Sequence, residues 1–159
     1  MSIVPVTEGD WALLKNIRLE SLQDSPDAFG ITYAEAKEIP EGKWKSLASG
    51  VNDLKFFFYR TDNEIIGLVG GVLLDGEYEL VSMWVKPDQR KIGVGFRLAK
   101  ELLAHAKSHG YSSVVLSVSV NNQAAYRLYS KIGFRVVEEK YSGSRAELKK
   151  MVWRSASEP

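Results

Sequence analysis

Residues 79–109 constrain the fold most, because the spacing of their apolar side chains changes partway along the segment. The run Glu79–Val85 holds β-branched and aromatic residues, which is typical of a buried strand, and Pro87 ends it because proline cannot donate to a strand ladder. Gly110 favours the end of a following helix. The apolar side chains of that helix recur at helical spacing: Val94, Leu98, Ala99, Leu102, Leu103 and Ala106. The segment is therefore predicted to form a strand, a loop and a helix.

The loop in this segment combines glycines at 93 and 95 with the basic residues Arg90 and Lys91. The first turn of a helix presents unbonded backbone N–H groups and the positive end of the helix dipole, and glycine lets a ligand approach that backbone. The pattern predicts a phosphate or pyrophosphate site, with a plain turn as the alternative. Two common phosphate motifs are excluded. No Gly-Lys-Ser/Thr is present, and Leu98 occupies the place of the third glycine in a dinucleotide fingerprint.

Two blocks resemble motifs of the GCN5-related N-acetyltransferase (GNAT) family. Residues 90–95, Arg-Lys-Ile-Gly-Val-Gly, are similar to the family's acetyl-CoA signature, Arg/Gln-x-x-Gly-x-Gly/Ala. Residues 122–134, Asn-Gln-Ala-Ala-Tyr-Arg-Leu-Tyr-Ser-Lys-Ile-Gly-Phe, are similar to its later motif, Asn-x-x-Ala-x-x-Leu-Tyr-x-x-x-Gly-Phe. The two blocks in this order are specific to the family. The resemblance covers about Leu54 to Trp153, whereas the first 50 residues fit only the general layout of the family.

The chain is predicted to form a single α/β (α+β) domain of the GNAT type over residues 1–159, with residues 155–159 as a frayed tail. A mixed, mostly antiparallel central sheet of six or seven strands is expected from these segments: Ile3–Val6, Leu54–Tyr59, Ile65–Leu74, Tyr78–Val85, Val114–Val120, Phe134–Lys140 and Glu147–Arg154. About four helices should flank it: one capped by Thr7, one from Tyr33 to Leu47 that Pro40 or Gly42 interrupts, one after Gly95, and one from Asn122 to Lys131.

The resemblance implies acetyl-CoA as cosubstrate and no metal. In the family the cofactor arm lies along the strand that precedes the glycine loop, and the loop holds the pyrophosphate. Asn122, which can cap its helix, is expected to make a polar contact to the same arm. The residues expected to bind the cofactor are Met83, Trp84, Val85, Arg90, Lys91, Ile92, Gly93, Val94, Gly95, Phe96, Asn122 and Tyr129.

Two residues are candidates for proton transfer. Some family members carry a basic glutamate at the offset of Glu79, and alternation along a strand would place it on one face with Met83 and Val85. A solvated strand end is the alternative, and the base would then be another residue or water. Tyr129 matches the tyrosine that protonates the coenzyme A thiolate in many family members, with a core tyrosine as the alternative.

Composition narrows the function. A net charge of +1 gives no case for a nucleic-acid partner, no apolar run approaches a membrane span, and the absence of cysteine removes the commonest covalent acyl carrier. A cytoplasmic N-acetyltransferase is expected, acting on a primary amine of a small molecule or peptide by direct attack in a ternary complex. Homodimers are common in the family. The alternative is a coenzyme-A-binding regulatory module without catalysis, and the sequence does not identify the acceptor.

Overall fold

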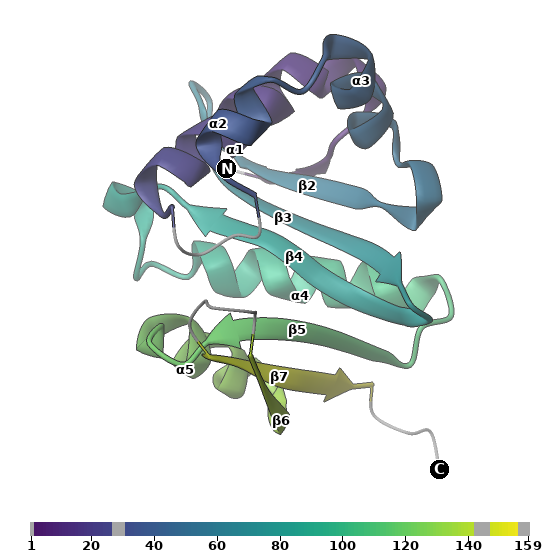
Figure 1. Ribbon diagram of the computed structural model, residues 1–159, viewed down its shortest axis with the longest axis vertical. Coiled ribbons are helices and arrows are strands. Elements are labelled where there is room, and N and C mark those ends of the chain that lie inside the picture. The colour runs from purple at the N-terminus through teal and green to yellow at the C-terminus, as the bar shows by residue number, and fades with distance from the viewer. Residues whose placement is uncertain (1, 27–30, 142–146, 156–159) are drawn as a thin grey trace.

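The computed structural model describes residues 2–26, 31–141 and 147–155 (Figure 1). Their strands form one seven-stranded sheet in the order β1-β2-β3-β4-β5-β7-β6. All neighbouring strands are antiparallel except β4 and β5, which are parallel, so the predicted mixed and mostly antiparallel sheet is confirmed. The strands are β1 Ser2–Pro5, β2 Lys55–Arg60, β3 Ile65–Leu74, β4 Glu77–Val85, β5 Ser113–Ser119, β6 Arg135–Tyr141 and β7 Glu147–Arg154.

The helices that the structure describes are α1 Trp11–Asp24, α2 Tyr33–Lys37, α3 Glu41–Ser49, α4 Val94–Ser108 and α5 Gln123–Ile132. Short 3₁₀ turns also occur at Glu8–Asp10, Val51–Asp53 and Pro87–Gln89. The helix expected from Tyr33 to Leu47 is two helices, because Pro40 disfavours helical backbone in the residue before it and caps α3 instead. Gly42 lies inside α3 and interrupts nothing. This split accounts for five α-helices where about four were expected.

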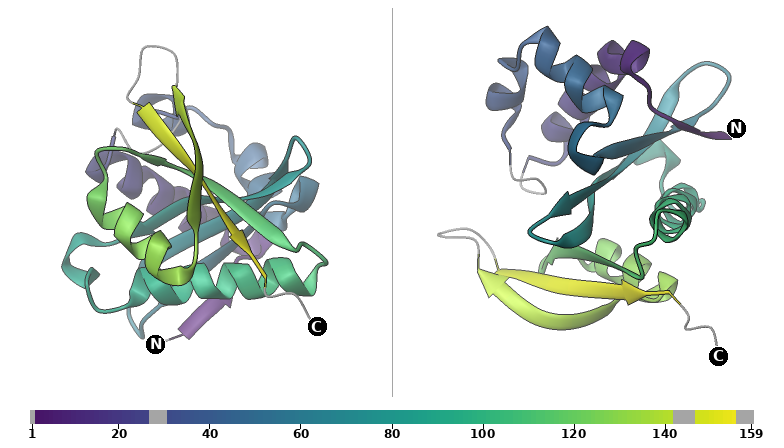
Figure 2. Two further views of the ribbon diagram at one scale, coloured as in Figure 1. Left: turned by 90° about the horizontal axis from the view of Figure 1, so that it is seen from below. Right: turned by 90° about the vertical axis from the view of Figure 1, so that its right-hand side faces the viewer.

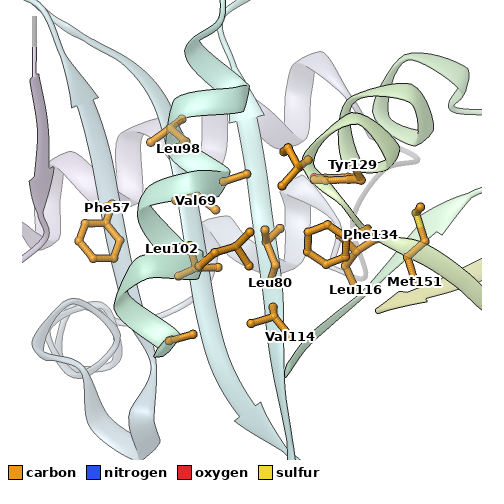
Figure 3. Packing of buried hydrophobic residues seen from close by; sticks show 14 of the residues in the cluster. Phe57, Val69, Leu80, Leu98, Leu102, Val114, Leu116, Tyr129, Phe134 and Met151 are labelled. Carbon is orange, nitrogen blue, oxygen red and sulfur yellow. The ribbon is translucent and has the colours of Figure 1, made fainter. Parts of the chain in front are cut away.

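The sheet is covered on both faces (Figures 1 and 2). Helices α1 and α3 pack on one face over a smaller cluster that includes Leu14, Ile17, Trp44, Phe58, Leu68 and Trp84. Helices α4 and α5 pack on the other face over the larger cluster. Figure 3 shows Leu98 and Leu102 of α4 beside Val69 and Leu80 of the sheet. The whole predicted apolar face of α4 is buried. The amphipathic period of residues 94–106 therefore gave the correct buried face.

Local signals set the chain reversals. Asp75 and Gly76 both have positive φ, 49° and 80°, as a type I′ turn requires, and they join β3 to β4 in a hairpin. At the N-terminus the Asp10 carboxylate accepts a hydrogen bond from the Thr7 backbone N–H at 2.9 Å, so Thr7 caps the short turn that leads into α1. The turn predicted around Tyr141–Arg145 and the frayed tail fall mostly or wholly outside the described residues.

The parallel pair β4 and β5 is joined at one position only, where Glu79 lies opposite Val115. Each strand is paired along its length on its other side, β4 with β3 and β5 with β7. Toward their carboxyl ends β4 and β5 separate, and Figure 1 shows α4 crossing behind the space between them. Beyond Glu79, the described residues of β4 therefore have no strand partner on the β5 side, an arrangement that suits an extended ligand.

Among the helices that the structure describes, none combines the length and the apolar character that crossing a membrane requires.

Candidate functional site

The carboxyl ends of β4 and β5 lie at the same edge of the sheet because the two strands are parallel. Each strand is followed by a helix, β4 by α4 and β5 by α5. Ligands of open α/β sheets bind outside the carboxyl ends of such strands. The two sequence motifs occupy these two connections, so the fold brings them to one place.

The loop between β4 and α4 leaves the start of α4 open. Lys91 and Gly93 both adopt positive φ, 69° and 93°, which turns the chain sharply into the helix. Gly93 is the N-cap residue, no side chain of the described residues caps the first turn by a hydrogen bond, and that turn holds no acidic residue. Ile92 is 62% exposed beside it. A helix start without a side-chain cap suits an anion, and the phosphate site at the start of α4 stays a prediction.

Gly95 has a structural reason to lack a side chain. A Cβ atom there would lie 3.2 Å from Leu128 Cδ2 of α5 and 3.7 Å from Val85 Cγ2. The first turn of α4 thus packs directly on α5, at Leu128, the residue before Tyr129. Sequence reasoning attributed this glycine to close approach of the ligand alone, and it missed the helix contact.

The Arg90 side chain donates hydrogen bonds to two groups of the protein itself. Its Nε donates to the carbonyl of Val85 at 2.8 Å, and Nη2 donates to Asp24 Oδ2 at 2.7 Å. A direct contact from Arg90 to a phosphate therefore stays a prediction. Lys91 contributes positive charge near the start of α4.

The end of β4 presents backbone to the space beside β5. Trp84 and Val85 are buried on opposite faces of the sheet, Trp84 with the α1 cluster and Val85 with the α4 cluster. Met83 packs partly buried against the α4 cluster. Their expected role is a backbone one, and among the described residues their backbone has no partner in β5.

The prediction that Glu79 shares a face with Met83 and Val85 is wrong. Ser82 has φ of 58°, and the register with β3 shifts there, since Val81 pairs with Gly70 and Trp84 with Leu68. This β-bulge adds one residue to β4 and reverses the alternation beyond it. Glu79 therefore lies on the face of α1 and α3, partly buried at the position where β4 and β5 join.

Tyr129 belongs to the other face. It is 6% exposed within the larger cluster, and its ring meets Phe134 edge-on at 5.6 Å (Figure 3). Burial raises the pKa of the Tyr129 hydroxyl well above its ordinary value, so this group holds its proton at neutral pH. The core interpretation is correct for the ring. The hydroxyl remains a candidate proton donor.

Asn122 caps α5 as predicted. Its side chain accepts a hydrogen bond from the Ala125 backbone N–H at 3.1 Å. The amide nitrogen of Asn122 is not used in this bond and can donate to a ligand. In the part of the chain that the structure describes, no group of three or more His, Asp or Glu side chains could hold a metal ion.

Sequence reasoning did not connect Asp24 with Trp84 or Arg90. Asp24 ends α1, and its Oδ2 accepts from the Trp84 indole Nε1 at 2.8 Å as well as from Arg90. The only signal was the indole itself, because a buried tryptophan N–H needs an acceptor. Nothing in the sequence named which acceptor.

Comparisons with known proteins agree with this architecture. The uncharacterized N-acetyltransferase YobR of Bacillus subtilis is 32% identical over 97 residues, which cover 60% of this chain and 39% of that protein. The chain thus spans well under half the length of this relative. Structural likeness, which at these identities concerns the fold, is high to a yncA acetyltransferase of Salmonella typhimurium with acetyl-CoA (TM-score 0.78, 17% identity, 100% and 97% of the two chains). The structural likeness is similar for the PaiA N-acetyltransferase of Thermoplasma acidophilum in complex with coenzyme A (TM-score 0.75, 21% identity, 98% and 100% of the two chains).

The sequence model of the acetyltransferase (GNAT) family matches residues 16–134. This range contains both motifs, the separated strands and the uncapped helix start. The family resemblance seen in the sequence is thereby confirmed, and the chain belongs to the acetyltransferase (GNAT) family.

Proposed function

We propose that this chain is an acetyl-CoA-dependent N-acetyltransferase that moves an acetyl group to a primary amine of a small molecule or peptide. The observation that carries the proposal is the uncapped start of α4 beside the separated ends of β4 and β5. One feature suits a pyrophosphate and the other an extended amide-bearing arm. Acetyl-CoA contains both a pyrophosphate and an extended amide-bearing arm, and the two are joined end to end.

The residues that would hold acetyl-CoA follow from this fit. The backbone of Met83–Val85 would pair with the pantetheine amides, and the N–H groups at the start of α4 would bind the pyrophosphate. Asn122 would add a polar contact from α5. When bound, acetyl-CoA supplies an acyl group already activated as a thioester.

The two candidate proton-transfer residues lie on opposite faces of the sheet. Glu79 lies on the α1 face and Tyr129 in the cluster on the α4 face. An amine with a lysine-like pKa of about 10 is mostly protonated at neutral pH, so a base must take a proton for attack. We assign this step to Glu79, with water or another residue as the alternative. The C–N bond forms as the C–S bond breaks, and the Tyr129 hydroxyl gives its proton to the departing sulfur. The nitrogen loses its second proton after the C–N bond has formed, and this proton returns the Tyr129 phenolate to its neutral form, directly or through water.

Direct attack in a ternary complex is favoured because the sequence contains no cysteine to carry the acetyl group. The acceptor would enter from the face of α1 and α3, where Glu79 lies. Nothing described on that face forms a cluster of charge that identifies one amine class.

The test combines binding and turnover. Thermal unfolding is measured with and without acetyl-CoA, and thiol release is then followed with a panel of amines and peptide N-termini. The proposal expects stabilisation by acetyl-CoA and amine-dependent thiol release. Stabilisation without release from any amine would support the regulatory module, and no stabilisation at all would contradict both.

A further inference from the structure

One carboxylate oxygen connects three parts of the chain that are distant in sequence. Asp24 Oδ2 accepts hydrogen bonds from Trp84 Nε1 at 2.8 Å, Arg90 Nη2 at 2.7 Å and Ser25 Oγ at 2.9 Å. Trp84 belongs to β4, Arg90 to the loop before α4, and Asp24 itself is the last residue of α1. The carboxylate thus joins the helical layer on one face to the loop that leads to the other face.

Arg90 extends this connection to the backbone of β4. Its Nε donates to the carbonyl of Val85, the last residue of that strand, at 2.8 Å. The guanidinium is therefore held at two points, one on α1 and one on β4. It lies midway along the loop that sets the position of Gly93 and the start of α4.

A plain surface ion pair is the simpler interpretation, because the side chains of Arg90 and Asp24 are 42% and 27% exposed. Exposed pairs of this kind contribute little to stability. The Trp84 indole makes this carboxylate more than a surface ion pair, because it also uses Asp24 as its acceptor. Trp84 is 4% exposed, and a buried N–H left without an acceptor is costly. Hydrogen bonds from Trp84 and Arg90 also lower the pKa of Asp24, which keeps the carboxylate charged at neutral pH.

We propose that Asp24 is a positioning residue for acetyl-CoA, acting through Arg90 and Trp84 to hold the end of β4 and the loop 86–93 in the conformation that binds the cofactor. The inference rests on the proposed function of that loop. Asp24 does not touch the cofactor in this account. It acts from the acceptor face, so it couples the layer that contains α1 to the phosphate site.

This coupling is reciprocal by thermodynamic necessity. If the Asp24–Arg90–Trp84 contacts favour the binding conformation, then bound acetyl-CoA must in turn stabilise those contacts. The last turn of α1 should therefore become better protected from hydrogen exchange when the cofactor binds. A surface pair with no link to the loop would produce no such effect.

The test measures acetyl-CoA dissociation constants by calorimetry for the full chain and its variants. We expect about a tenfold increase for Asp24→Asn and for Arg90→Gln. The double variant should show about the same tenfold loss, because both changes break the same Asp24–Arg90 contact, whereas independent effects would multiply to about a hundredfold. Trp84→Phe, which keeps a ring and removes the N–H, should weaken binding in the same direction. The kcat at saturating acetyl-CoA should stay within about threefold for Asp24→Asn, as a positioning role for the cofactor requires.

Two matched controls separate this role from general effects. Ser25→Ala removes a donor from the same carboxylate oxygen but does not disturb the loop. Glu64→Gln weakens another ion pair, that with Lys86 at 3.0 Å, next to the same loop. Both should leave the dissociation constant within about twofold of the wild type.

Hydrogen exchange at residues 20–24 should slow on adding acetyl-CoA to the wild type and change much less in Asp24→Asn. Unchanged acetyl-CoA affinity in folded Asp24→Asn, or a multiplicative double variant, would overturn the proposal. Failure of the wild type itself to bind acetyl-CoA would instead contradict the proposed function. If Asp24→Asn does not fold, Trp84→Phe and Arg90→Gln carry the same comparison.

Discussion

The helices α4 and α5 begin at the same edge of the sheet, and they begin differently. α4 starts at Gly93 with no side-chain cap, whereas the Asn122 side chain caps α5 by accepting from the Ala125 N–H. A helix start without a cap is less stable unless another group satisfies its N–H groups. Under the proposed function, acetyl-CoA would complete the start of α4, whereas the start of α5 is already capped by Asn122.

The largest effect is expected outside both helices, at Glu79. Glu79→Gln keeps the shape of the side chain and removes its basicity. We expect kcat near pH 7 to fall about 10²-fold or more, the scale of a general base, with acetyl-CoA affinity almost unchanged. The loss of kcat should shrink as the pH approaches the pKa of the acceptor amine, because unprotonated amine is then abundant. A steady-state pH series measures this, and full activity of the variant at pH 7 would transfer the role to water or another residue.

The next effect concerns the chemical contribution of α5. Tyr129→Phe removes only the hydroxyl, so we expect kcat to fall by about 10-fold to 10³-fold. The free energy of unfolding should change by no more than about 1.5 kcal/mol. Because burial raises the pKa of Tyr129, the wild type should show no loss of activity from its ionisation up to about pH 10. Normal turnover with a large loss of stability would make Tyr129 a core residue only.

A smaller effect is expected at the contact between the two helices. Gly95→Ala should raise the acetyl-CoA dissociation constant about tenfold, or about 1.4 kcal/mol. The added Cβ meets Leu128 of α5, so Gly95→Ala with Leu128→Ala serves as the matched control. If the ligand needs the space, the double variant stays weak. Recovery of affinity in the double variant would show that Gly95 serves helix packing.

The smallest effect is expected at the cap of α5. Asn122→Ala should lower the free energy of unfolding by about 1 kcal/mol, the usual contribution of such a cap. Addition of acetyl-CoA should not restore this loss, since the ligand is expected to complete α4. Thermal unfolding with and without acetyl-CoA measures both quantities. If acetyl-CoA restored the free energy of unfolding of Asn122→Ala, the ligand would also complete α5, and the two helix starts would not differ in this respect.

The elements that sequence reasoning predicted well are those whose local chemistry leaves few choices. Asp75-Gly76 fixed a hairpin, the buried face of α4 followed its helical period, and Asn122 and Gly133 bounded α5. The two motifs gave the family because they specify backbone geometry around a shared ligand.

The misses depend on contacts between distant residues. Ser82 carries no signal for a bulge, since serine rarely adopts positive φ, and this bulge moved Glu79 to the other face. Asp24 is one of many scattered acidic residues, and only the fold brings it to Trp84 and Arg90. The contact of Gly95 with Leu128 likewise arises from the packing of α4 on α5.

The most direct test of the account follows the backbone amides of both helix starts by NMR during titration with acetyl-CoA. If acetyl-CoA completes α4, the amides of Val94, Gly95 and Phe96 should show large, saturable shifts. A much smaller shift is expected for the Ala125 amide, which Asn122 already occupies. Saturable binding that leaves the first-turn amides of α4 unmoved would contradict the claim that acetyl-CoA completes this helix.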